Sequence, residues 1–414
     1  MVGARLAHVD TGELERAYRA EATRLRATLA RRLGDVALAE ELVQDAFVEA
    51  LEHWEADGVP ANPGGWLTTT AWRKALDRQR RAKVGREKLA LLAISEDRAG
   101  APAAAAVESA DDEDMLSLIF ACCDPALPAD SQVALTLRAV CGLTTAEIAA
   151  AFLVSEQAMG QRLSRAKRSL REEGVTVRVP DPDQLGERLA TVLAVVYLVF
   201  DEGYLASAGR TPARRDLAAQ AISLARLLHR LMPREPEALG LLSLLLLHES
   251  RAAARFDGWG RLIRLAEQDR SRWDRDLAAE ATGLLDRAIA LRQAGPYQVQ
   301  AAIAALHAAA PDYHQTDWEQ IRLLYGRLDI MTPSPVVRLN GAVATRYVLG
   351  PEPALAEVDA LAADLDDYRL FHAVRAELLT ALGRTEDARA ANERALKLAA
   401  NPAERELIAR RLTV

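Results

Sequence analysis

The sequence is a succession of amphipathic segments with the periodicity of α-helices, separated by short turns that contain Gly and Pro. Half of its 414 residues are apolar, and only 5% are aromatic. Ala, Leu and Arg recur throughout, and this mixture favours helix over sheet. We therefore expect an all-α protein, whose length suggests roughly two to four domains.

The cysteines and the apolar runs indicate the environment of the chain. Cys122 and Cys123 are adjacent and Cys141 stands apart, so they form neither a disulfide framework nor the CxxC spacing of a zinc site. We interpret them as buried apolar residues in a reducing compartment. The first ten residues lack the apolar stretch of a signal peptide, and the apolar run 239–247 is far shorter than the ~18 to 20 residues that span a bilayer. We expect a soluble, cytoplasmic protein without a metal site.

Catalytic motifs find little support. The seven histidines are dispersed, and neither a P-loop nor a G-x-S-x-G motif occurs. His248 and Glu249 begin like the HExxH motif of zinc proteases, but Ala252 stands where the second histidine would be. We expect no catalytic residues and no cofactor, and we predict that the protein is not an enzyme.

The charges are distributed unevenly along the chain. Segment 66–88 contains eight Arg and Lys against two acids, and segment 155–171 contains five against one. Segment 95–114, between them, holds seven acids against one arginine. Two basic patches are therefore separated by an acidic spacer, and the net charge of −7 argues against a protein that coats nucleic acid over its whole surface.

The sequence divides the chain into four parts. Residues 57–65 contain two prolines and three glycines, which predicts a break, and helix resumes from 66 to 81. The Ala-rich stretch 99–106 is typical of a linker, and 175–184 contains two prolines. We expect the following division: 1–84, a first helical module; 85–111, a flexible acidic linker; 112–175, a second helical module; 185–414, a helical extension.

The segment 143–168 has the pattern of a helix-turn-helix. Thr144 can cap a helix in which Glu147 reaches back to it, and Ser155 can cap a second helix. We predict that Ala158 and Leu163 point inward. The outward residues of the second helix would contact DNA, the first ones at base edges and the later Arg and Lys at phosphates. A capped, amphipathic helix pair with arginines that serve only solubility gives the same pattern, so its context matters.

These motifs resemble two regions of sigma-70 family sigma factors, in the expected order. Residues 143–170 resemble the promoter-reading helix-turn-helix of region 4, and 120–138 resemble its supporting helices. Residues 39–47 resemble the region 2 helix that docks on the RNA polymerase clamp, and 63–81 resemble the helix that melts and reads the −10 element. As a departure, Asp124 stands where His is expected after the paired cysteines.

The resemblance implies two partners, core RNA polymerase and promoter DNA. The loop before residue 66 would capture a flipped base, with Asn62 as the side chain that bonds a base edge. Trp66 and Trp72 are candidates for stacking on a base, although either or both could instead be core residues. The residues expected to bind DNA are Asn62, Trp66, Trp72, Arg73, Lys74, Arg78, Arg80, Arg81, Ser155, Glu156, Gln157, Gln161, Arg162, Arg165, Lys167 and Arg168. Those expected to bind polymerase are Glu41, Leu42, Asp45 and Phe47.

The extension 185–414 carries an approximate repeat near its end. Gly350 and Gly383 are 33 residues apart, and Ala354 and Ala388 are 34 apart, which is the tetratricopeptide period. Blocks at 197–204, 267–274 and 317–321 resemble the extension of those extracytoplasmic-function (ECF) sigma factors that end in a tetratricopeptide-like domain. We expect such a domain, although a plain helical bundle remains an alternative. It would regulate the modules by intramolecular contact or through a protein partner, or it would only stabilise them.

Two other functions fit parts of the pattern. A helix-turn-helix regulator with a helical-repeat sensing domain would bind an operator without polymerase, but it would not need the basic helix 66–81. A scaffold protein with incidental basic helices would bind neither polymerase nor promoter DNA.

Overall fold

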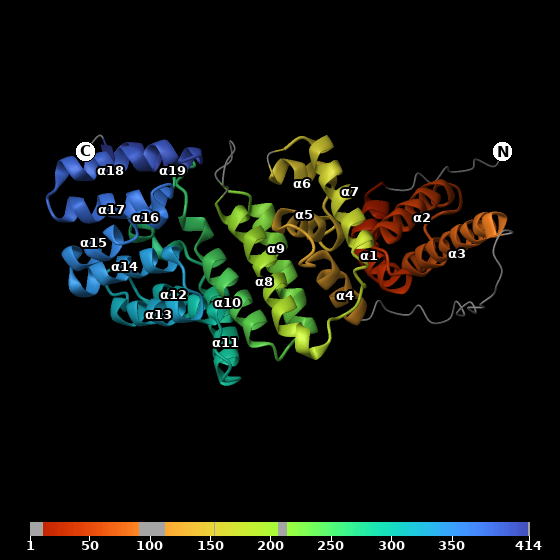
Figure 1. The fold of residues 1–414 in the computed structure, drawn as a ribbon, viewed down its shortest axis with the longest axis horizontal. Helices are drawn as coiled ribbons and strands as arrows, with labels where there is room; N and C mark the ends of the chain where they lie inside the picture. Colours follow the sequence, from red (N-terminus) through yellow and green to blue (C-terminus); the bar gives the residue numbers. More distant parts are fainter. Residues whose placement is uncertain (1–10, 91–111, 153, 206–212, 413–414) are drawn as a thin grey trace, which may run out of the picture. The chain divides into compact units, whose positions relative to one another are not determined.

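The computed structural model describes residues 11–90, 112–152, 154–205 and 213–412 (Figure 1). As expected, the fold is all-α, and the described parts of the chain contain no β-strand. The chain divides into two compact units, residues 1–195 and 196–414, here called unit 1 and unit 2. The division falls inside helix α8, Pro182–Tyr204.

Unit 1 begins with three helices that pack against one another. Their bounds are Thr11–Leu33 for α1, Val36–Asp57 for α2 and Pro63–Ala90 for α3. Alanines such as Ala27, Ala39 and Ala46 are fully buried and let the helices approach closely. Around them, Leu42, Trp54 and other large side chains complete the core.

Helix α3 begins earlier and ends later than the sequence predicts. Its first residue is Pro63, whose fixed φ and missing N–H suit the first helical position, so Gly64 and Gly65 lie in the first turn and not in the break. The helix then continues to Ala90, through six residues that the sequence analysis assigned to the linker. The remainder of the expected linker, 91–111, lies outside the described residues.

Four further helices complete the second module of unit 1. They are α4, Asp112–Cys122; α5, Ala129–Ala139; α6, Thr145–Ala151; and α7, Glu156–Glu172. Cys122 and Cys123 are buried, as expected, and burial raises the pKa of the Cys123 thiol to about 12. Cys141 is half-buried, and burial raises its pKa to about 12 as well. The thiols are therefore protonated at neutral pH, which fits packing groups better than metal ligands.

Unit 2 is a stack of helices that follow one another in chain order (Figure 1). Its α-helices after α8 are α9, Arg215–Leu231; α10, Pro236–Ser250; α11, Arg275–Ala290; α12, Pro296–Ala309; α13, Trp318–Met331; α14, Pro335–Leu349; α15, Pro351–Asp359; α16, Ala362–Leu365; α17, Arg369–Ala381; α18, Thr385–Leu398; and α19, Pro402–Leu412. The 3₁₀ turns Ala252–Ala254, Leu265–Glu267 and Arg270–Arg272 lie in the connection between α10 and α11.

Helix α10 is apolar on nearly all sides because it is enclosed by protein. It packs against α9, α11 and α12, and the run from Leu239 to Leu247 is buried. Gly240 permits the approach of α12, since a Cβ there would lie 2.8 Å from the backbone nitrogen of Gln298. Among the described residues, no helix has the length and apolar character needed to cross a membrane.

The two copies of the repeat occupy equivalent positions in unit 2. Gly350 follows α14 and Gly383 follows α17, and their φ angles of 98° and 72° lie in the left-handed region that favours glycine. Each glycine leads into the next helix, where Ala354 and Ala388 are buried. The sequence repeat therefore corresponds to two successive helix hairpins, α14–α15 and α17–α18.

Candidate nucleic-acid interface

Helix α3 carries the first predicted group of cationic side chains. Arg73, Arg78 and Arg80 are exposed, whereas Lys74 is half-buried. Lys74 forms an ion pair of 2.7 Å with Glu49 of α2, and Arg78 forms one of 2.6 Å with Glu41. These pairs are solvent-accessible and therefore weak, so a phosphate can compete for either cation. The side chain of Arg81 lies outside the described residues.

The start of α3 holds the residues predicted to contact bases. The Asn62 side chain is exposed, and its Oδ1 accepts a hydrogen bond of 2.9 Å from the backbone N–H of Gly65. Asn62 thus satisfies one of the free N–H groups in the first turn of α3, which sequence reasoning did not anticipate. Its amide nitrogen is the side-chain group that the cap does not use.

The two tryptophans of α3 are both half-buried. Trp66 packs edge-to-face on the buried Trp54, with ring centroids 5.5 Å apart, and also contacts the His53 ring. The guanidinium of Arg32 lies 5.8 Å from the centroid of the Trp72 ring. Neither tryptophan is a fully enclosed core residue. Both roles that the sequence left open, packing in the core and stacking on a base, therefore remain open for each of them.

The predicted helix-turn-helix corresponds to α6 and α7. Thr144 and Glu147 form a complete capping box, and Ser155 Oγ accepts a hydrogen bond of 3.2 Å from Ala158 N–H. One inward assignment was wrong, because Ala158 is exposed and its neighbour Met159 is fully buried. Leu163 is buried as predicted.

Most of the predicted contact residues of α7 share one exposed surface. The exposed ones are Ser155, Glu156, Gln157, Gln161, Arg165 and Arg168. Gln157, Gln161 and Arg165 are four residues apart and therefore lie in a row along the helix. We call this row with its exposed neighbours Glu156 and Arg168 the α7 surface.

Two cations that were assigned to DNA are instead held against protein. Arg162 lies over the Phe152 ring, 5.3 Å from its centroid, and is 3.6 Å from Asp130. Lys167 Nζ donates a hydrogen bond of 2.9 Å to Glu40 Oε2. In this arrangement both side chains are directed at protein groups, so neither is part of the α7 surface.

Glu40 joins the two modules of unit 1. Its side chain is only 7% exposed, and it accepts hydrogen bonds from Arg138 of α5 at 2.6 Å and from Lys167 of α7 at 2.9 Å. Burial alone would raise the pKa of the Glu40 carboxyl, but the attraction of Lys167 and Arg138 outweighs it and lowers the pKa. Glu40 is therefore ionised at neutral pH.

Other contacts hold the same two modules together. Arg31 of α1 pairs with Glu113 at 2.7 Å and with Asp114 at 2.8 Å, both on α4. The buried Arg26 donates a hydrogen bond to the carbonyl of Ala139. Only the linker was expected to join the modules, and these contacts were not predicted from the sequence.

The predicted polymerase-binding residues of α2 separate into two groups. Glu41 and Asp45 are exposed, whereas Leu42 and Phe47 are only 1% and 6% exposed. Leu42 and Phe47 were assigned to the partner surface, but they belong to the core that supports the helix. Val48 and Leu51 on the same helix are about half exposed, at 55% and 51%, and the sequence did not single them out because apolar residues alone do not reveal which face they occupy.

Asp124 has a structural role that fits its unexpected place in the sequence. Its Oδ2 is 2.9 Å from Arg188 Nη1, and Arg188 also donates to the Phe120 carbonyl at 2.8 Å. Its Oδ1 accepts from Ala126 N–H at 2.9 Å and so shapes the turn between α4 and α5. The aspartate thus anchors the beginning of α8 to the second module.

The positions of the matches with known families follow these modules. Residues 17–84 match the model of Sigma-70 region 2, and residues 119–170 match the model of Sigma-70 region 4. Residues 188–289 match a family of unknown function (DUF6596). The chain is also 45% identical to an uncharacterized protein of Rhizobium meliloti (strain 1021) over 397 residues, which cover 95% of this chain and 94% of that protein.

Proposed function

The chain belongs to the sigma-70 family of sigma factors, and from this premise we propose that it directs promoter-specific transcription initiation as a factor of the ECF type. Membership implies a non-enzymatic transcription factor that binds core RNA polymerase and promoter DNA. In our proposal, region 2 melts the −10 element and region 4 recognises the −35 element. The C-terminal helices regulate this activity.

The α7 surface is the observation that carries the proposal. Its amino-terminal end presents Glu156, Gln157 and Gln161, whose side chains can donate to or accept from base edges in a major groove. Arg165 and Arg168 follow further along the helix, where phosphates would lie. The caps at Thr144 and Ser155 fix the two helices of the motif, so this order of polar and then cationic side chains is held rigidly.

Helix α3 supports a role in strand separation. Holding single-stranded DNA needs cations along the backbone and aromatic rings beside the bases, and stacking contributes roughly 1–3 kcal/mol per base. Arg73 and Arg80 supply exposed charge, and Trp66 and Trp72 are accessible on part of their surfaces. A regulator that binds only double-stranded operators has no use for this combination, which favours a sigma factor over that alternative.

A reconstituted holoenzyme tests the function. Core RNA polymerase and the purified chain would be mixed, promoter fragments that the complex retains would be selected from genomic DNA, and initiation would be measured on them. We expect the double variant Arg73→Ala, Arg80→Ala to form fewer open complexes at low salt, with a deficit in log K that shrinks as salt rises, because each lost phosphate contact lowers the salt dependence of binding. Arg389→Ala, which changes an exposed helical arginine of unit 2, is the matched control. A chain that does not bind core polymerase would overturn the proposal.

For the C-terminal region, we propose a tetratricopeptide-like regulatory domain. The hairpins α14–α15 and α17–α18, with left-handed glycines at the same place in each, support this assignment. Regulation would act through contact with the sigma modules or through a protein partner.

A truncation tests the regulatory role. A chain that ends after Tyr204 keeps α8 and with it the pair between Arg188 and Asp124. Circular dichroism and thermal unfolding would verify that its sigma modules remain folded. We expect promoter output to differ from that of the full chain, and identical output would contradict regulation by this region.

A further inference from the structure

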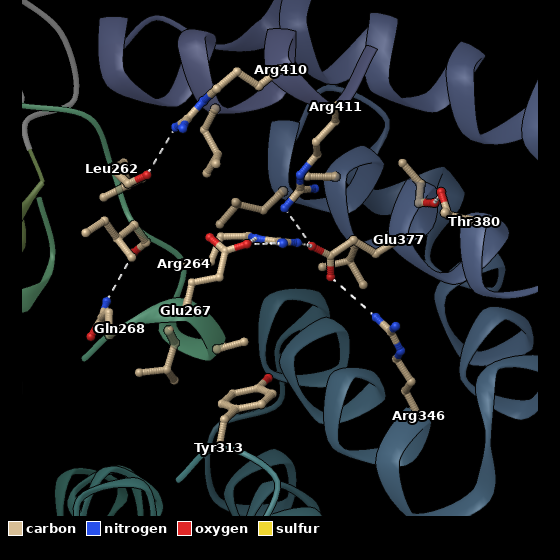
Figure 2. Close-up of a pocket in the computed structure, with 18 of the residues that line it drawn as sticks. Leu262, Arg264, Glu267, Gln268, Tyr313, Arg346, Glu377, Thr380, Arg410 and Arg411 are labelled. Carbon is tan, nitrogen blue, oxygen red and sulfur yellow. Dashed lines mark hydrogen bonds and ion pairs between the residues drawn. The ribbon is translucent and has the colours of Figure 1, made fainter. Parts of the chain in front are cut away.

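Unit 2 contains a cavity of about 910 Å³ that the sigma activity does not explain. Its walls come from α14, α17, α19 and the segment between α10 and α11 (Figure 2). Pockets that bind small molecules commonly have volumes of about 300–1,000 Å³. The cavity therefore has the size of a small-molecule site.

The charges that line the cavity are mostly positive, although the chain as a whole has a net charge of −7. The cationic lining residues are Arg251, Arg255, Arg264, Arg346, Arg410 and Arg411. The anionic ones are Glu267 and Glu377. Six positive charges against two leave an excess of four, and such a concave concentration of one sign attracts ligands of the other.

Glu377 is shared among three of these arginines, which approach it from different sides (Figure 2). Arg411 lies 2.6 Å from its carboxylate, Arg264 lies 3.3 Å away and Arg346 lies 3.5 Å away. Each guanidinium has five N–H donors, and a single carboxylate cannot accept hydrogen bonds from all the donors of three guanidinium groups. Arg264 also pairs with Glu267, but Nε and Nη1 of Arg411 are buried without a hydrogen-bond partner among the described residues, so donors remain for a further anion.

Two of the arginines that line the cavity are buried enough for burial to lower their pKa values. Burial lowers the pKa of Arg411 even though Glu377 attracts its charge. Burial also lowers the pKa of Arg255 to about 10, and the neighbouring Arg251 adds to this effect. Burying a cation is costly unless an anion accompanies it, so a bound anion would stabilise both groups.

Most of the remaining lining is apolar or aromatic, with Gln268, Thr380 and Asn392 as the polar exceptions, so the cavity offers a ligand more than charge. Leu370, Val374 and Leu407 contribute alkyl surface, and Tyr313 and Tyr347 contribute rings. A hydrated inorganic ion would leave this surface exposed to water, whereas an organic body would cover it.

We propose that this cavity binds a small organic anion in which at least two negative charges, as phosphate or carboxylate groups, are attached to an apolar or aromatic body. The anionic groups contact Arg346, Arg411 and Arg264, and the body packs against the tyrosines and leucines. This site is independent of the DNA-binding surface and of the proposed sigma activity.

Fluorescent titration of the full-length chain tests the site. The probe is 8-anilinonaphthalene-1-sulfonate, an aromatic anion whose emission rises in apolar surroundings. We expect saturable binding at one site, and displacement by 1-naphthyl phosphate at lower concentrations than by inorganic phosphate or by 1-naphthol. If 1-naphthol displaced the probe as well as 1-naphthyl phosphate does, the charge of the ligand would be irrelevant. If inorganic phosphate displaced it equally well, the apolar body would be irrelevant. Either result would overturn the proposal.

Substitutions that remove a positive charge and substitutions that remove a negative charge should change ligand binding in opposite directions, which distinguishes an effect on binding from damage to the fold. Arg346→Gln removes a cation and should weaken 1-naphthyl phosphate binding about tenfold, the change expected for one charged hydrogen bond. Arg346→Lys keeps the charge and should retain most of the affinity. Glu377→Gln removes the competing carboxylate and should strengthen binding severalfold. Arg389→Gln, on the exposed side of α18, should have no effect.

Thermal unfolding without the probe shows whether each variant is folded. The titrations of the folded variants then test the proposed site. If Glu377→Gln and Arg346→Gln weaken binding alike while both melt as the unaltered chain does, Glu377 does not compete with a ligand and the proposal fails. If Glu377→Gln unfolds, the difference between Arg346→Gln and Arg346→Lys still decides, and equal affinities in those two variants would refute the proposed contact.

Discussion

Lys167 Nζ lies 2.9 Å from Glu40 Oε2, although 127 residues separate the two in the chain. The pair joins α7, the second helix of the helix-turn-helix, to α2 of the first module. Arg138 contacts the other carboxylate oxygen at 2.6 Å and also donates to the carbonyl of Leu143. A buried acid thus fixes α5 and α7 of the second module on the first.

Glu40→Gln should destabilise unit 1. The amide keeps the shape of the side chain but leaves Arg138 and Lys167 without a counter-ion, and loss of one partner from a buried charged hydrogen bond costs about 1–3 kcal/mol. Urea unfolding would measure the change in the free energy of unfolding. Glu41→Gln is the matched control, because Glu41 is the exposed neighbour and its pair with Arg78 is accessible to solvent. Equal effects of the two substitutions would contradict the buried pair.

The contribution of Glu40 to stability should depend on pH. Because its pKa is lower in the folded chain than its ordinary value of 4.5, folding favours the ionised form, so the contribution is complete above that ordinary pKa. As the pH falls through the folded pKa, the carboxyl is protonated and the contribution is lost. The difference in unfolding free energy between the unaltered chain and Glu40→Gln should therefore be constant near pH 7 and shrink as the pH falls below 4.5. A difference that does not change with pH would exclude Glu40 as its source.

The structural features that could be predicted from the sequence are those that neighbouring residues determine. The caps at Thr144 and Ser155 depend on residues three positions away, and the left-handed glycines depend on the local turn, so these features are legible in one sequence. The contact of Glu40 with Lys167 depends on how separate helices pack, and no local pattern encodes it. The exchange of Ala158 for Met159 has a related cause, because adjacent helical positions differ by only about 100° and tertiary packing decides which one is buried.

Ser155→Ala should weaken the helix-turn-helix by removing the cap of its second helix. The serine caps α7 through the N–H of Ala158, and loss of such a cap costs about 1 kcal/mol. Ser155→Asp, which keeps an acceptor at the cap, should restore the free energy of unfolding. Chemical denaturation of all three chains checks this, and a Ser155→Asp chain as unstable as Ser155→Ala would argue against the cap.

Arg188→Ala should loosen the attachment of α8 to the second module. The substitution leaves Asp124 buried without its cation and removes the bond to the Phe120 carbonyl. We expect a loss of about 1–3 kcal/mol, together with faster amide hydrogen exchange at the amino-terminal end of α8. Arg178→Ala provides a control, since Arg178 pairs with Asp181 at the exposed surface before the helix. Exchange that accelerates equally in both variants would mean that Asp124 does not anchor α8.

Two substitutions on the α7 surface should change promoter binding in different ways. Arg168 is expected to neutralise a phosphate, so Arg168→Ala should weaken holoenzyme binding to all −35 sequences alike and reduce the slope of log K against log salt by about 1. Gln161 is expected to face a base edge, so Gln161→Ala should leave the slope unchanged and relax the preference at one base pair, a change of about 1–3 kcal/mol. Binding measured at several salt concentrations, on promoters that differ at single −35 positions, separates the two effects. If both variants lose affinity uniformly with the same salt slope, α7 attracts DNA by charge without reading it, and assignment of −35 recognition to this helix would fail.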